Sequence, residues 1–176
     1  MAKFAINTLE FTKVREKLSQ YAGTAMGQRL AMELMSSSRF EEVKLSQEET
    51  AEAVRILDEG RRIPLGGITD ISGLVKRTRV GSLLDPEEFK AIQDAISGML
   101  DLKAFLKEVS ETAPALVRYS DELHDFSRLS KQLSSVLDEK GNIKDTASVK
   151  LSGLRTGILV ARNRVKDKLS DLLHLS

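Results

Sequence analysis

Residues 84–106, LDPEEFKAIQDAISGMLDLKAFL, contain the clearest helix start in the chain. The Asp85 carboxylate can cap the first turn, and Pro86 suits the first helical position because it lacks an amide donor. The two glutamates that follow face the positive end of the helix dipole. The apolar residues beyond them recur mostly at steps of three and four: Phe89, Ile92, Ile96, Met99, Leu100 and Leu106. This spacing predicts a long amphipathic helix that ends before residue 114.

The same spacing extends outward in both directions, whereas β-branched runs are short and aromatic residues make up only 5% of the chain. We expect helices on either side of Gly23, a long helix that starts at a Ser38–Glu41 capping box, and a short helix after Asp70. We expect a further, shorter helix after residue 125. The sequence 138–145 favours a turn with at most a minor β-hairpin. The predicted fold class is therefore all-α, a multi-helix domain.

The most regular pattern of the chain covers residues 147–176 and predicts one long helix after a helical core-like domain over residues 1–146. This helix has an apolar seam that one lysine interrupts. The seam consists of Leu151, Leu154, Ile158, Ala161, Val165, Lys168 and Leu172. We expect the part from Leu151 to Ile158 to pack within its own domain. The residues expected to seek a partner helix are Val165, Leu169, Leu172 and Leu173. No stop signal precedes the last residue, so we expect this helix to be truncated.

Composition and spacing predict no catalytic, cofactor-binding or metal site in this chain. It has no cysteine, and its two histidines, His124 and His174, lie too far apart in sequence for one helix to bring them together on a metal. The segment 23–29 lacks the Lys-Ser/Thr of a phosphate loop. No signal peptide and no apolar stretch of ~18 residues is present. We therefore expect a cytoplasmic protein without membrane contact.

Basic residues cluster on the predicted last helix, although 27 Lys and Arg against 26 Asp and Glu leave a net charge of only +1. The candidates for facing nucleic acid are Arg155, Arg162, Arg164, Lys166 and Lys168. Such contacts would be made to phosphates and would weaken with salt. The alternative interpretation is a solvated helix face, since stacking aromatics are missing nearby.

Several stretches, in the expected order, resemble the MutS-two family. They are LEFTKV at 9–14, GQRLA at 27–31, PLGGITDI at 64–71, LDPEEF at 84–89 and DEKGNIKDTAS at 138–148, followed by Leu151 and Leu154-Arg155. Together they cover most of the chain. The last of these resembles the entry of that family into its long lever helix. The resemblance therefore implies that the chain is the N-terminal core and lever-base part of such a protein.

Proteins of this family are dimeric ATPases with a helical core, lever, clamp and ATPase domain, and usually a C-terminal Smr domain with a possible endonuclease activity. The resemblance implies binding of DNA or of the ribosome, in suppression of homologous recombination or in splitting of collided ribosomes. It implies ATP and Mg²⁺ for the full-length protein, and a homodimer. No position of this chain matches the family's ATP-binding or nuclease residues, so none is transferred here.

A different interpretation of the same residues is a helical protein-interaction or dimerisation module without nucleic-acid contact. The seam of the last helix favours it, because a seam longer than a small domain needs would be buried by a partner helix. Both interpretations predict that this chain itself performs no catalysis.

Overall fold

The computed structural model describes residues 10–138 and 140–174, with side chains described as far as residue 170. Within these ranges the regular elements are helices, so the all-α prediction is confirmed. The elements are α2 (Phe11–Tyr21), α3 (Ala25–Glu33), α4 (Phe40–Asp58), α5 (Ser72–Arg79), α6 (Pro86–Glu108), α7 (Pro114–Glu122), α8 (Ser127–Val136), the 3₁₀ helix η1 (Asp145–Ala147) and α9 (Val149–His174). The expected hairpin is reduced to one antiparallel bridge between Leu137 and Ile143.

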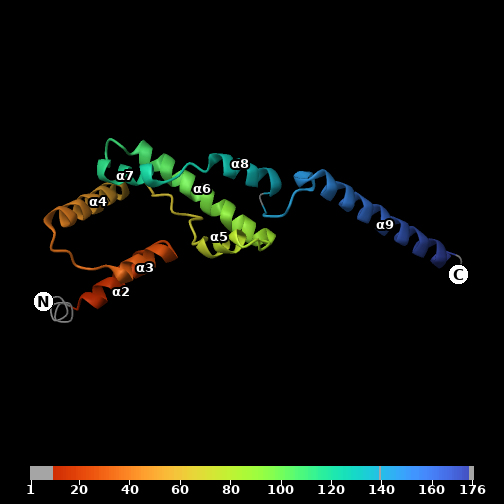
Figure 1. Cartoon of the computed structure of the whole chain (residues 1–176), viewed down its shortest axis with the longest axis horizontal. Coiled ribbons are helices and arrows are strands. Elements are labelled where there is room, and N and C mark those ends of the chain that lie inside the picture. The colour runs from red at the N-terminus through yellow and green to blue at the C-terminus, as the bar shows by residue number, and fades with distance from the viewer. Residues whose placement is uncertain (1–9, 139, 175–176) are drawn as a thin grey trace.

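The helices form an elongated molecule (Figure 1). Helix α6 packs against α7 and α8, α4 packs against α7, and α2 pairs with α3. Helix α9 extends away from the other helices, at the end of the molecule opposite to α2. None of the described helices is long and apolar enough to cross a membrane.

The buried core lies where α4, the end of α6 and the start of α7 meet. Its fully buried members are Ile56, Val109 and Ala113, with three partly buried residues packed around them: Ile63, Phe105 and Leu116. Removing such side chains from water is the main favourable term in folding. The core therefore fixes α4 and α6 to α7.

Glu52 of α4 is only 5% exposed, and its carboxylate reaches the N-terminus of α7. The backbone amides of Ala115 and Leu116 donate to its two carboxylate oxygens over 3.1 and 2.9 Å. Helix α7 has no side-chain cap from its own N-cap residue, Ala113. Since the first amides of a helix lack intrahelical acceptors, Glu52 supplies from another helix the cap that α7 lacks.

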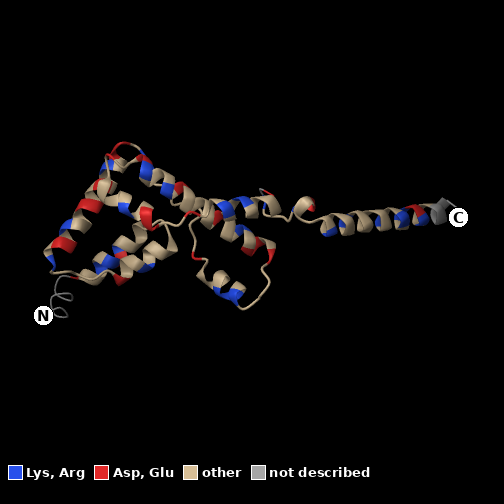
Figure 2. Ribbon diagram, turned by 45° about the horizontal axis from the view of Figure 1, so that its top comes forward, with Lys and Arg blue, Asp and Glu red and all other residues tan. Residues whose placement is uncertain are grey.

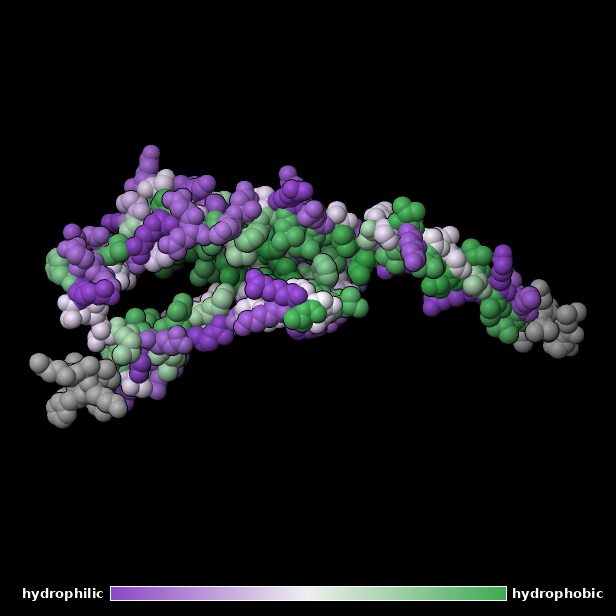
Figure 3. All heavy atoms as spheres, viewed as in Figure 1, coloured by the Kyte–Doolittle hydropathy of each residue, from purple (hydrophilic) through white to green (hydrophobic). Residues whose placement is uncertain are grey.

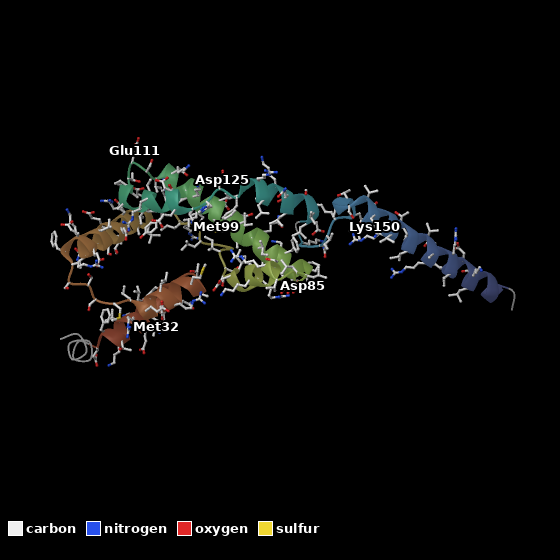
Figure 4. The ribbon with its side chains drawn as sticks, viewed as in Figure 1. Met32, Asp85, Met99, Glu111, Asp125 and Lys150 are labelled. Carbon is white, nitrogen blue, oxygen red and sulfur yellow. The ribbon has the colours of Figure 1, made fainter. Side chains whose placement is uncertain are left out.

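The start of α6 agrees with the sequence prediction. The Asp85 carboxylate accepts a hydrogen bond from the Glu88 amide over 2.8 Å, and Glu88 accepts one from the Asp85 amide over 3.1 Å. Pro86 occupies the first helical position. This capping box lies at the end of α6 that is marked by Asp85 in Figure 4.

Two local predictions were wrong. The predicted capping box of Ser38 and Glu41 does not form, because α4 begins at Phe40 and its N-cap residue makes no side-chain cap. Instead the Ser37 hydroxyl accepts a hydrogen bond from the Arg39 amide over 3.1 Å and donates one to the Glu42 carboxylate over 2.7 Å. Helix α7 was not predicted at all, although a proline at its first position is a recognised start signal.

We predict that Glu52→Gln lowers the free energy of unfolding by about 1–3 kcal/mol, because the buried carboxylate holds two backbone amides and its charge faces a helix N-terminus. Urea unfolding followed by circular dichroism measures this. The matched control is Glu48→Gln on the same helix, whose side chain is 53% exposed, and which should change stability by less than about 0.5 kcal/mol. Equal effects of the two substitutions would show that the cap on α7 contributes little.

Candidate functional site: the exposed helix and its base

Helix α9 is exposed along nearly its whole described length. Every residue from Ser152 to Ser170 is exposed, and Leu151 is the last half-buried one. The element against which α9 packs is η1, at its own base. A helix in water normally gains most of its stability from packing an apolar face. Helix α9 therefore presents a surface that its own domain does not cover.

The seam on α9 lies open to solvent. Leu154 and Ile158 are 58% and 54% exposed. The expectation that residues 151–158 pack within their own domain was therefore wrong beyond Leu151, which is half-buried. The rest of the domain does not extend far enough along α9 to cover Leu154 and Ile158. Val165 and Leu169, both expected to seek a partner helix, are 59% and 56% exposed. In Figure 3 hydrophobic residues continue along α9 well beyond the body of the molecule.

Two further residues predicted for the seam, Leu172 and Leu173, belong to the last turns of α9, but their side chains lie outside the described residues. The assignment of these four residues to a partner-helix seam stays a prediction.

The basic residues form bands along α9, as Figure 2 shows. Arg162, Arg164, Lys166 and Lys168 are exposed. Lys150, labelled in Figure 4, lies in the first turn and is exposed as well. At about 100° per residue, Arg162 and Lys166 follow one edge of the seam and Arg164 follows the other. The basic residues thus border the apolar seam on both sides.

Arg155, the fifth predicted nucleic-acid-facing residue, makes contacts within the chain. Its guanidinium donates to the Ile143 carbonyl over 3.0 Å and forms an ion pair with Asp145. These contacts join α9 to the segment just before it. Sequence analysis missed this partner, because Asp145 precedes Arg155 by ten residues across a turn and no helical spacing relates them.

Residues 140–148, the base segment, lie directly before α9. Polar contacts hold this base segment to α8. The Lys144 amide donates to the Val136 carbonyl and its ammonium to the Ser134 carbonyl, both over 2.8 Å. A cation on the last carbonyls of a helix is favourable because the helix dipole is negative there. At the end of the base segment next to α9, the Ser148 hydroxyl accepts a hydrogen bond from the Leu151 amide over 3.1 Å and so caps α9.

Asp138 closes the turn that leads into the base segment. Its carboxylate accepts hydrogen bonds from the amides of Lys140 and Asn142 over 2.9 and 2.8 Å. Hydrogen bonds from the backbone and side chain of Asn142 hold the pKa of the Asp138 carboxyl below its usual value. Because the folded pKa is depressed, the turn keeps this stabilisation above the ordinary pKa and loses it as pH falls through the lowered one.

A second exposed apolar surface lies on the α2–α3 pair. Leu18, Tyr21, Leu30 and Leu34 line an open hollow of about 350 Å³, and Tyr21 and Leu30 are mostly exposed. The side chains that surround it offer no charge pattern or polar group that identifies a ligand. Among the described residues no cluster of histidine, aspartate and glutamate could hold a metal ion.

The fold and this helix define an all-helical domain that extends into one exposed, seam-bearing helix. No family model matches the chain. Over 179 aligned positions that include the whole chain, it is 31% identical to the putative endonuclease MutS2 of Bacillus subtilis (strain 168) and to the endonuclease MutS2 of Bacillus cereus (strain B4264). The alignment spans only 23% of each relative. The chain is thus similar over its whole length to part of the MutS2 proteins, in agreement with the motifs that it shares with that family.

We predict that replacing both Asp145→Asn and Arg155→Gln loosens the joint between α8 and α9, because it removes the ion pair at the base of α9. The cysteine-free chain allows spin labels at Lys131→Cys and Ser170→Cys, and double electron–electron resonance measures their distance distribution. The distribution should be clearly broader in the double variant. A label pair at Ser152→Cys and Ser170→Cys, within α9, should not change. An unaltered 131–170 distribution would show that other contacts set the direction of α9.

Proposed function

We propose that this chain forms the helical core and the lever base of a MutS2-type protein, with residues 1–146 as the core and 147–176 as the start of the lever. The observation that carries this proposal is the exposure of α9, combined with similarity to MutS2 proteins over the whole chain. A lever has to project from its domain and to carry a movement without bending. A helix of 26 residues with its base tied by Lys144 and Arg155 suits that task.

In this proposal the driving free energy comes from other parts of the whole protein, which would bind ATP and Mg²⁺ and act as a homodimer. Nucleotide binding can shift a lever only if it favours one of two arrangements of the joint. The joint between α8 and α9 combines the buried Leu137, which bridges to Ile143, with the polar contacts of the half-buried Lys144 and the exposed ion pair of Arg155. The exposed ion pair is weak enough to rearrange at modest cost.

The whole protein would act on DNA in suppression of homologous recombination or on collided ribosomes. The curated relatives are named endonucleases, and we propose that any such activity belongs to segments outside this chain. What α9 adds is a set of basic residues on an exposed helix. These suit contacts to phosphates, which position a nucleic acid without reading its sequence.

We expect the purified chain to hydrolyse neither ATP nor nucleic acid, because its described residues present no metal cluster and its sequence has no phosphate loop. Phosphate release and cleavage of labelled duplex DNA, both with Mg²⁺ present, measure this. Turnover that co-purifies with the chain and is lost on substituting one of its own residues would overturn the proposal that catalysis lies elsewhere.

The nucleic-acid part of the proposal is tested by salt-dependent binding of the chain to duplex DNA and to structured RNA. The variant combines Arg162→Gln, Arg164→Gln, Lys166→Gln and Lys168→Gln and leaves Arg155 in place to hold the base. If all four residues contact phosphates, the slope of log K against log salt on duplex DNA should fall by about 3–4.

The matched control variant removes the same charge elsewhere, with Lys76→Gln, Arg79→Gln, Arg128→Gln and Lys131→Gln. It should bind like the unaltered chain. Equal binding by the α9 variant and the control would remove α9 from the nucleic-acid interface. A preference for RNA over DNA, or the reverse, shows which nucleic acid the helix accepts.

A further inference from the structure

Helix α4 carries an apolar stripe on the face opposite its core contacts. The stripe consists of Phe40, Val43, Val54 and Leu57, whose positions on the helix fall on one side. Their exposed fractions are 74%, 37%, 48% and 57%. Ile56, the core residue of α4, points about 150° away from the middle of the stripe. A large exposed apolar patch of this kind marks a surface that another element covers.

The apolar surface of the α2–α3 pair meets this stripe at the linker between α3 and α4, residues 34–39. Leu34 lines the hollow of α2–α3 described above. With Met35 it also lines a second open hollow, of about 560 Å³, whose other wall includes Val43 and Thr50 of α4. In Figure 3 open space separates α2–α3 from α4. The two apolar surfaces are therefore continuous through Leu34.

Few contacts hold the α2–α3 pair to the rest of the domain. The two helices pack against each other and not closely against another described helix. The linker is exposed and has no regular structure. At its start the Leu34 amide donates to the Ala31 carbonyl of α3, and near its end the Ser37 hydroxyl donates to Glu42 of α4. Between these two anchored ends the linker can act as a hinge.

Among the described residues, one ion pair ties the α2–α3 pair to the body of the domain. The Arg29 guanidinium of α3 donates to the Asp70 carboxylate over 2.7 Å. The other oxygen of Asp70 accepts a hydrogen bond from the Ser72 amide over 3.0 Å. The segment just before Asp70 lies so close to α6 that a Cβ on Gly98 would come within 2.6 Å of the Gly66 carbonyl oxygen. Arg29 therefore holds a fixed point of the body.

Breaking this ion pair costs little, and closing the gap removes apolar surface from water. The side chains of Arg29 and Asp70 are 60% and 32% exposed, so water can replace their contact. Tyr21 and Leu30 of the α2–α3 surface are 78% and 68% exposed, and covering them is favourable. Because a short linker already joins the two surfaces, bringing them together costs little chain entropy. A closed arrangement can therefore compete with the open one.

The net charges of the helices also favour contact between α2 and α4. Helix α2 carries three basic residues and one acid, whereas α4 carries six acids and two basic residues. Glu41, Glu48 and Asp58 of α4 are exposed. Opposite net charges on α2 and α4 favour their approach. A second copy of the chain would offer the same charges but would lack the linker that holds the two surfaces near each other.

We propose that the α2–α3 pair is a hinged flap that closes over the apolar stripe of α4, and that the Arg29–Asp70 ion pair is the latch that holds the flap open. The hinge is the linker of residues 34–39. The open flap leaves the stripe of α4 free for contact with other elements. The closed flap covers the stripe with its own apolar hollow. The proposal does not depend on the lever function proposed above.

Double electron–electron resonance on the full chain measures the closure, with spin labels at Gln20→Cys on α2 and Glu48→Cys on α4, both exposed. The labelled chain with an intact latch should give mainly the longer distance. Arg29→Gln should raise the population with the shorter distance about two- to fivefold, the factor that an exposed ion pair contributes to such an equilibrium. The matched control, Lys13→Gln, removes one positive charge from α2 without touching the latch and should leave the distribution unchanged.

Two further variants separate release of the latch from docking on the stripe. Asp70→Asn weakens the latch from the other side and keeps an oxygen for the Ser72 amide, so it should act like Arg29→Gln. Val54→Asp, added to Arg29→Gln, places a charge in the stripe and should return most of the population to the longer distance. A urea unfolding curve confirms that this chain still folds, since Val54 is 48% exposed.

Three outcomes overturn the proposal. The same distribution in Arg29→Gln and in the Lys13→Gln control would show that the ion pair is not a latch. A shorter distance that survives Val54→Asp would show that the released flap does not dock on the stripe. A short distance in samples of singly labelled chains would make a second copy, and not the flap of the same chain, the element that covers α4.

Discussion

The hydrogen bonds from the start of α7 to the Glu52 carboxylate join parts of the chain that lie more than 60 residues apart. A buried carboxylate is costly unless its oxygens are occupied, and the first amides of a helix are costly unless they find acceptors. Here each group satisfies the other. The contact holds α4 to α7 beside the core of Ile56, Val109 and Ala113, and α6 and α8 are positioned from there. Helix α8 in turn packs against η1, the element on which α9 rests.

The two ends of the molecule are held by different kinds of interaction. Around Glu52 the contacts are buried, and loosening them would expose both charge and apolar surface. At the base of α9 the ion pair of Arg155 and Asp145 is exposed, so water can replace it at little cost. The contacts of Lys144 beside it are half-buried. The contacts where α4, α6 and α7 meet are thus more costly to break than the exposed ion pair where α9 begins. That difference would suit the proposed lever base, since a lever needs its movement at the joint and not within the body.

The sequence allowed accurate prediction where the decisive contacts are local. The start of α6 was predicted because Asp85, Pro86 and Glu88 lie within one turn, and α9 was predicted because its seam repeats over many residues. Helix α7 was missed although Pro114 offers a local start signal, because the side chain that caps it, Glu52, comes from another helix and no local pattern connects the two. The role of Arg155 was missed for the same reason, since its partner Asp145 lies across a turn. The exposure of Leu154 and Ile158 could not be read from periodicity, which shows that a face is apolar and not whether anything covers it.

These observations also change what the basic residues of α9 mean. Taken as a list, five arginines and lysines suggest one phosphate-binding face. In the structure Arg155 is committed to the base of the helix, and the others border an apolar seam on both sides. A phosphate backbone that contacts Arg162 and Arg164 would therefore meet the apolar seam between them. If α9 contacts nucleic acid as proposed, the phosphates would lie along the edges of the helix, and Arg155 would contribute only by holding its base.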